Sequence, residues 1–224
     1  MRTLFFTLLS LLSCLSSAAQ EKSSTELAIE RQGFVDLQKI DPTILVDLMY
    51  TRADNFTGKV LYTDLHRGYL HPEAAKALQQ AQATLKKLRP DLSLKVYDAA
   101  RPMCIQQRMW NVVAGTPKNI YVSNPKNGGG LHNYGLAVDI TLCDATTGDT
   151  LHMGTKVDYL GKLAHVRDEA EFIRKKQLNP TAIANRKLLR KVMASAGFKV
   201  LPTEWWHFNF RSRAEAKAKY KVIQ

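Results

Sequence analysis

The chain has 224 residues, of which 45% are hydrophobic and 23% charged, and its formal net charge is +12 at pH 7. This composition excludes a disordered or fibrous chain and is typical of one globular domain with a real apolar core. The basic charge is concentrated from residue 151 to the end. No nucleic-acid-binding motif accompanies it, so we expect a solvated helix surface that attracts anionic surfaces and no nucleic-acid partner.

The N-terminus has the pattern of a secretory signal peptide. Arg2 precedes an apolar run over residues 4–15, and small residues follow up to Ala19. One positive charge, a short apolar segment and a small-residue cleavage site predict a signal peptide over residues 1–19 and a secreted or periplasmic protein. The alternative is a lipoprotein signal with a lipid anchor at Cys14. No later segment is long and apolar enough to predict a transmembrane helix.

The first part of the mature chain predicts short elements. Residues 20–33 are polar and are expected to form a loose leader. Residues 34–40 alternate in hydropathy and predict a short strand, and residues 44–50 continue with an apolar, β-leaning run. The composition of residues 51–58 predicts a loop, in which Phe56 is either a buried anchor or part of the wall of a site.

The middle of the chain alternates helix and strand signals. His71-Pro72-Glu73 predicts the start of a helix, and Arg89-Pro90-Asp91 predicts its end. A strand is expected over residues 92–98 and a second helix over residues 102–113. Residues 115–130 are rich in Gly, Pro, Asn and Ser and predict a loop.

The last part predicts a buried strand, helices and a closing hairpin. Asn179 followed by Pro180 is typical of a helix N-terminus, and Gly197 of a helix end. The expected elements are a strand over 135–142, helices over 168–176 and 180–196, hairpin strands over 198–201 and 205–210, and a helix-prone basic tail from 211. Together these predict an α+β fold, a small and mostly antiparallel sheet with helices packed on it, in a single domain over residues 20–224.

Cys104 and Cys143 are the cysteines that remain after cleavage at Ala19. Export would permit a disulfide between them, but their spacing leaves open whether they form a bridge or stay unpaired.

A small set of residues has the composition of a catalytic metal site. His132 and Asp139 are seven residues apart, with Gly135 between them to let the backbone bend, and Glu204 comes three residues before His207. A hydrolytic zinc centre needs three protein ligands and a nearby carboxylate that moves protons. Singly, each of these residues has an ordinary structural interpretation, because a histidine in a Gly-rich loop or an aspartate in a strand is common.

The combined pattern is much more specific. His132-x-x-Gly135-x-Ala137-x-Asp139 together with Glu204-x-Trp206-His207 resembles the signature of the D-alanyl-D-alanine dipeptidases, zinc peptidases related to the D,D-carboxypeptidases and the hedgehog signalling domain. Three further segments resemble family segments in the same order: Asp54-Asn55-Phe56-Thr57-Gly58, Asp98-Ala99-Ala100-Arg101-Pro102 and Met153-Gly154-Thr155-x-x-Asp158.

The resemblance implies a role for each matched residue. It implies one zinc ion held by the two histidines and the aspartate, with Glu204 as general base and then acid. It implies that Arg101 stabilises the oxyanion and that Asp158 holds the free ammonium of a small D-amino-acid peptide. The expected reaction is hydrolysis of D-alanyl-D-alanine or related cell-wall-derived peptides by a zinc-activated water.

One residue departs from the family pattern. Gly130 stands two residues before His132, where the family has a serine that helps to bind the substrate. Strict preference for the free dipeptide is therefore not implied. The alternatives are a D,D-carboxypeptidase that acts on longer peptidoglycan stem peptides and a non-catalytic zinc-binding domain of the same fold. The pairing of Glu204 with Arg101 favours an enzyme, because a binding module needs neither.

Overall fold

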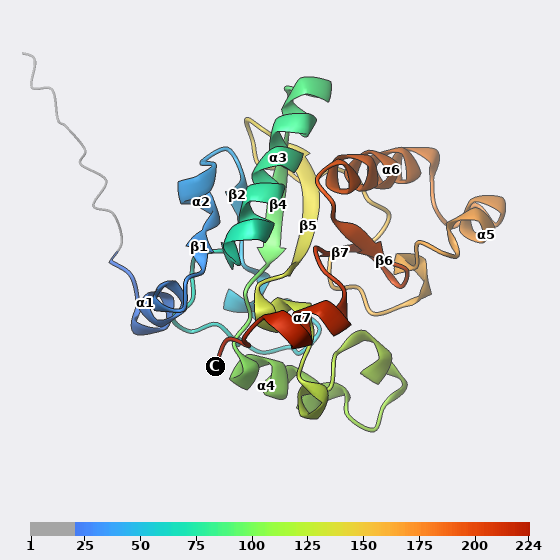
Figure 1. The fold of residues 1–224 in the computed structure, drawn as a ribbon. Coiled ribbons are helices and arrows are strands. Elements are labelled where there is room, and N and C mark those ends of the chain that lie inside the picture. Colours follow the sequence, from blue (N-terminus) through green and yellow to red (C-terminus); the bar gives the residue numbers. More distant parts are fainter. Residues whose placement is uncertain (1–20) are drawn as a thin grey trace, which may run out of the picture.

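A five-stranded mixed sheet forms the centre of the molecule in the computed structural model, which describes residues 21–224 (Figure 1). The expected signal peptide over residues 1–19, with Cys14, lies outside the described residues. The strands follow the order β2 (Leu45–Val46), β4 (Leu92–Asp98), β5 (Ala137–Asp144), β7 (Glu204–Asn209) and β6 (Lys199–Leu201). All neighbours are antiparallel except β2 and β4, which confirms the predicted α+β fold with a mostly antiparallel sheet.

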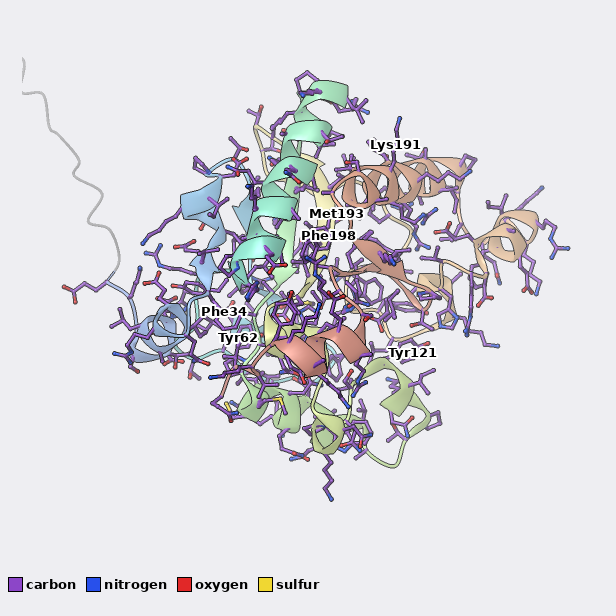
Figure 2. All side chains as sticks on the ribbon, viewed as in Figure 1. Phe34, Tyr62, Tyr121, Lys191, Met193 and Phe198 are labelled. Atoms are coloured by element: carbon purple, nitrogen blue, oxygen red, sulfur yellow. The ribbon has the colours of Figure 1, made fainter. Side chains whose placement is uncertain are left out.

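Two helices cover the sheet and close the larger core. Helix α3 (Pro72–Leu88) places Ala74, Leu78 and Leu85 at helical spacing on its buried face, and it packs beside α6 (Pro180–Ser195). Figure 2 shows Met193 and Phe198 between these two helices, toward the sheet. The apolar run of β5 is buried along almost its whole length, as expected for a central strand.

A second apolar cluster lies at the other end of the molecule. It contains Phe34, Tyr50 and Tyr62 together with Met109 of α4 (Met103–Val113). Figure 2 shows Phe34 and Tyr62 near α1, away from the α3–α6 pair. This cluster supports the two segments that carry Tyr50 and Arg101, because it contains Tyr50 itself and Ala100.

Two expectations for the N-terminal part are wrong. The polar stretch 20–33 contains helix α1 (Ser24–Arg31), because Ser23 and Glu26 form a reciprocal capping box. The stretch 34–40 contains a two-residue strand β1 (Val35–Asp36), paired with β3 (Tyr69–Leu70), and then helix α2 (Leu37–Ile40). Asp36 ends the strand because its side chain caps the helix by accepting a hydrogen bond from the Gln38 amide.

The predictions for the C-terminal half are confirmed. Asn179 caps α6 by accepting a hydrogen bond from the Ala182 amide at 2.8 Å, and β6 and β7 form the closing hairpin. The remaining helices are α5 (Glu169–Arg174) and α7 (Arg213–Lys219). The remaining short 3-10 segments are η1 (Met49–Thr51), η2 (Pro117–Tyr121), η3 (Pro125–Asn127), η4 (Leu131–Tyr134) and η5 (Lys162–Ala164).

Cys104 is exposed and Cys143 is buried, and both are free thiols. Across residues 21–224, none of the helices combines the length and the hydrophobicity that a bilayer crossing requires.

Candidate active site

Three predicted metal ligands come together at one end of the sheet. His132 lies in η4, Asp139 in β5 and His207 in β7. His132 Nε2 is 3.3 Å from Asp139 Oδ1, His207 Nδ1 is 3.0 Å from the same oxygen, and the two ring nitrogens are 3.2 Å apart. Among residues 21–224, this is the cluster of His, Cys, Asp or Glu side chains whose geometry suits a metal ion.

Hydrogen bonds to the outer nitrogens fix the tautomer of both rings. His132 Nδ1 donates to the Ala99 carbonyl at 2.8 Å, and His207 Nε2 donates to Asn209 Oδ1 at 2.8 Å. In the neutral rings, His132 Nε2 and His207 Nδ1 are therefore acceptors, as is the carboxylate of Asp139. Three acceptors that face one another at hydrogen-bond distance need a cation between them. These three atoms therefore fit the ligands of a divalent metal ion, and the hydrogen bonds to the outer nitrogens orient each ring.

The charge of Asp139 suits this role. Burial opposes its ionisation, but positive charge at His132 and His207 outweighs that effect and holds the pKa of Asp139 well below its usual range, and a cation bound between the three side chains would act in the same direction. The side chain is therefore an anion at neutral pH, as a metal ligand must be.

Gly135 forms the bend that the sequence predicts between His132 and Asp139. Gly135 has φ +62°, and a Cβ there would lie 2.5 Å from the Phe34 ring and 2.9 Å from the His71 amide nitrogen. The positive φ and the close packing against Phe34 and His71 require glycine at the turn between His132 and Asp139.

Arg101 lies beside the predicted metal ligands in a fixed orientation. Its Nε donates to Asp98 Oδ2 at 2.8 Å, and its Nη1 donates to Gln106 Oε1 at 2.9 Å. Its Nη2 is 3.7 Å from Asp139 Oδ2. Burial disfavours the charged form, but Asp98 raises the pKa of Arg101 well above its ordinary value, so the guanidinium stays charged. Tyr62 holds the other oxygen of Asp98 through a 2.6 Å hydrogen bond.

Glu204 is at the start of β7 and faces the same cavity as His207. Its side chain is buried, and none of the hydrogen bonds within residues 21–224 reaches its carboxylate. Burial raises the pKa of Glu204 to about 8, with Asp139 and Asp158 acting in the same direction. A buried carboxyl group with such a pKa can both take up and release a proton near neutral pH.

Asp158 is held in an unusual backbone conformation at the cavity wall. Its φ is +67°, which is uncommon for a residue other than glycine. Its Oδ1 accepts from the Tyr50 hydroxyl and its Oδ2 from the Phe56 amide, each at 3.0 Å. Burial raises the pKa of Asp158 to about 7. Phe56 itself lines the cavity, so it belongs to the wall of the site.

A hydroxyl group lies where the side chain missing at Gly130 would point. A Cβ added to Gly130 would lie 2.9 Å from Ser123 Oγ. Ser123 belongs to the 115–130 loop, and its carbonyl accepts a 2.8 Å hydrogen bond from Gln106. Both Gly130 and Ser123 line the cavity.

One cavity of about 1010 Å³ contains all six predicted site residues. Sequence reasoning missed Asp98, Tyr50, Gln106 and Asn209, which orient these residues. Asp98 had a signal, because it stands three residues before Arg101 in the matched segment. The other three had none, because each meets its partner only in the folded chain.

The comparisons with known proteins agree on one family. A sequence profile of the M15 peptidases, described as D-Ala-D-Ala dipeptidase, matches residues 30–223. The D-alanyl-D-alanine dipeptidase of Escherichia coli is 34% identical over 180 residues, which are 80% of this chain and 86% of that protein. The proteins of the same name from Enterococcus faecalis and Streptomyces coelicolor are 27% and 29% identical, over 79% and 74% of this chain and 90% and 85% of their own. The chain therefore belongs to the M15 family of D-Ala-D-Ala dipeptidases.

Proposed function

We propose that the protein is a zinc-dependent dipeptidase that hydrolyses D-alanyl-D-alanine or related small peptides derived from the cell wall. The observation that carries the proposal is the convergence of three acceptor atoms from His132, Asp139 and His207, beside the buried Glu204, whose carboxylate accepts no hydrogen bond from the described residues 21–224. The names of the relatives supply the substrate class.

Zinc is the metal that this site favours. Two imidazole nitrogens and one carboxylate are ligands of catalytic zinc centres, which keep a further position open for water or substrate. Zinc held there would polarise the scissile carbonyl and lower the pKa of a water molecule to about 7. The protein contributes the ligands, their fixed tautomers and the groups that move protons.

Glu204 would act as the proton carrier. In its ionised form it accepts a proton from the attacking water. The same carboxyl group then gives that proton to the leaving amine as the peptide bond breaks. Its burial keeps both forms accessible, because a pKa of about 8 favours the neutral acid near neutral pH and still leaves part of the group ionised.

Arg101 would stabilise the charge that develops on the carbonyl oxygen. The guanidinium is held by Asp98 and Gln106 before the substrate arrives, so little reorganisation is needed during the reaction. Its Nη2 lies within 3.7 Å of Asp139, which places its positive charge next to the reacting centre.

Asp158 would select peptides with a free N-terminus. Its carboxylate is oriented by Tyr50 and Phe56, and a substrate ammonium gives it a counter-ion. The sheet order places Arg101, at the end of β4, on one side of Asp139 and His207, with β6 on the other side. Because Tyr50 joins Asp158 to the β2–β4 side, a bound peptide would start there and extend across the ligands toward β6.

The size of the cavity favours a second candidate, a D,D-carboxypeptidase acting on longer stem peptides. About 1010 Å³ is at the upper end of ordinary ligand cavities and exceeds the need of a dipeptide. Rates on free D-alanyl-D-alanine and on its N-acylated form separate the two functions. The dipeptidase predicts faster cleavage of the free form, and faster cleavage of the acylated form would favour the carboxypeptidase.

We further infer export from the pattern of residues 1–19. A secreted or periplasmic protein would meet cell-wall peptides directly. N-terminal sequencing of the mature protein tests this proposal: a start at Gln20 supports it, a lipid-modified Cys14 supports the anchored alternative, and an intact Met1 in the cytoplasm contradicts both.

A further inference from the structure

A hydrogen-bonded chain of three side chains joins two loops at the cavity. The Tyr121 hydroxyl is 2.9 Å from His165 Nε2, and His165 Nδ1 is 2.8 Å from Asp168 Oδ2. Tyr121 ends η2 within the 115–130 loop, whereas His165 and Asp168 lie between η5 and α5. Figure 2 shows Tyr121 where the 115–130 loop approaches the C-terminal half of the chain.

The carboxylate fixes the direction of these hydrogen bonds. Asp168 in its ionised form only accepts, so His165 Nδ1 carries the proton and donates it. His165 Nε2 is then an acceptor, and the Tyr121 hydroxyl donates to it. The hydrogen of Tyr121 is thereby directed away from the cavity, and its oxygen keeps only lone pairs for another partner. His165 is 4% exposed, so this arrangement is held inside the protein.

Tyr121 lines the cavity on the side of Glu204. Burial raises the pKa of Tyr121, and the Glu204 carboxylate is the second cause of that shift, so the phenol is neutral and lies within electrostatic reach of the general base. Asp158 hydrogen-bonds to Tyr50, which follows β2, whereas Glu204 begins β7, beyond β4 and β5 in the sheet order. A peptide that is held at Asp158 by its ammonium and crosses the predicted metal ligands from there would present its leaving half to Glu204 and to Tyr121, which lines the same cavity.

We propose that Tyr121 is a substrate-contacting residue whose oxygen accepts a hydrogen bond from the scissile peptide N–H, and that His165 and Asp168 are its positioning residues. The inference rests on the proposed dipeptidase function. Tyr121 would then determine specificity for the bond that breaks. Its oxygen accepts a hydrogen bond from the N–H of an amide, and an ester has no such hydrogen.

The arrangement is consistent with the proton movements of the reaction. The peptide nitrogen receives its new proton from Glu204 as the C–N bond breaks, and its original N–H stays directed at Tyr121. Tyr121 therefore gains and loses no proton. Its contact aligns the nitrogen lone pair toward Glu204, because the N–H and the lone pair point in different directions.

Replacement of Tyr121 by phenylalanine tests the contact with two substrates. One is D-alanyl-D-alanine, and the other is its ester analogue, in which oxygen replaces the scissile N–H. Y121F should lower kcat/KM for the dipeptide roughly tenfold, the effect of one lost hydrogen bond. The ester has no N–H, so its kcat/KM, or its inhibition constant if turnover is slow, should not become worse.

Other outcomes overturn the inference in distinguishable ways. A parallel loss on both substrates would mean that Tyr121 only supports the wall of the site, and no loss on either would mean no contact. If the wild-type protein does not cleave the dipeptide, the proposed function itself fails. Tyr220, which is not among the residues that line the cavity and whose hydroxyl donates to Glu73 Oε2 at 3.2 Å, provides the matched control. Y220F should keep wild-type rates on both substrates.

Asp168 provides an independent test of the positioning role. In D168N the amide can donate to His165 Nδ1, which shifts the ring proton to Nε2 and turns the Tyr121 hydroxyl toward the cavity as a donor. D168N should reproduce the selective loss on the dipeptide, and the double variant Y121F/D168N should lose no more than Y121F alone. Additive losses in the double variant would contradict the hydrogen-bonded chain.

Discussion

Asp139 and His207 are directly opposite residues on the neighbouring antiparallel strands β5 and β7, and their side chains meet at 3.0 Å. Opposite residues of an antiparallel pair share one face of the sheet. On the other side of Asp139, the register places Asp98 of β4 in the same row. The sheet itself therefore aligns two predicted metal ligands with the carboxylate that orients Arg101.

Asn209 is predicted to tune metal affinity without touching the metal. Its Oδ1 accepts the hydrogen of His207 Nε2 and leaves Nδ1 free to bind. Asn209→Ala should weaken zinc binding by about 10- to 100-fold, the usual effect of losing such a partner. Competition with a chromophoric chelator measures the affinity. As a matched control, Asn185→Ala removes an exposed amide that bonds the His152 carbonyl and should leave zinc affinity unchanged. Equal affinity in N209A and wild type would contradict the assigned tautomer.

Glu204→Gln should abolish turnover while keeping the metal. It should also stabilise the metal-free protein. Folding raises the pKa of Glu204 from 4.5 to about 8, so as the pH rises Glu204 ionises in the unfolded chain before it ionises in the folded protein. The free energy of unfolding therefore falls as pH rises from about 4.5 to 8. The chelated E204Q variant should therefore exceed the wild-type Tm by more at pH 8 than at pH 5. Retained turnover would show that the base lies elsewhere.

Asp158 is predicted to set the acidic side of the pH dependence of KM. Its pKa is raised to about 7, so lowering the pH below 7 protonates it and removes the counter-ion of the substrate ammonium. KM for the free dipeptide should rise as pH falls from 7.5 to about 6. Asp158→Asn should raise KM throughout and flatten this dependence. A wild-type KM that stays constant over this range would reject the assignment.

Gly130 and Ser123 offer a reciprocal exchange. A side chain at Gly130 would meet Ser123 Oγ at 2.9 Å, so Gly130→Ser alone should displace the 115–130 loop and reduce kcat/KM. Ser123→Gly alone should also reduce it, by removing the hydroxyl from the cavity. The double exchange removes the clash and restores one hydroxyl, so it should recover activity relative to Gly130→Ser. A double variant no better than that single variant would argue against a shared position.

Most of the fold could be predicted from local sequence patterns. Such patterns act over a few residues, as do the proline and acid at the start of α3, the Asn179 cap and the apolar run of β5. Helix α1 had a comparable signal in Ser23 and Glu26, but its polar composition masked it. The prediction of one strand over residues 34–40 was wrong because a two-residue strand followed by a helical turn gives the same hydropathy pattern.

The site was predictable only in part. The combination of His132, Asp139, Glu204 and His207 resembled a known signature, so their grouping followed from the family and not from spacing. The residues that orient them depend on strand register and loop packing. Tyr121 and His165 are an example, because 44 residues separate them and neither lies in a recognisable motif.

Bound metal and hydrolysis of D-alanyl-D-alanine, both measured on the same samples of purified protein, test zinc-dependent catalysis most directly. We predict one zinc per chain with hydrolysis, loss of both after treatment with a chelator, and recovery of both when zinc is returned. Full hydrolysis by protein that contains no metal, or zinc-loaded wild-type protein that leaves the dipeptide intact, would contradict a zinc-dependent dipeptidase.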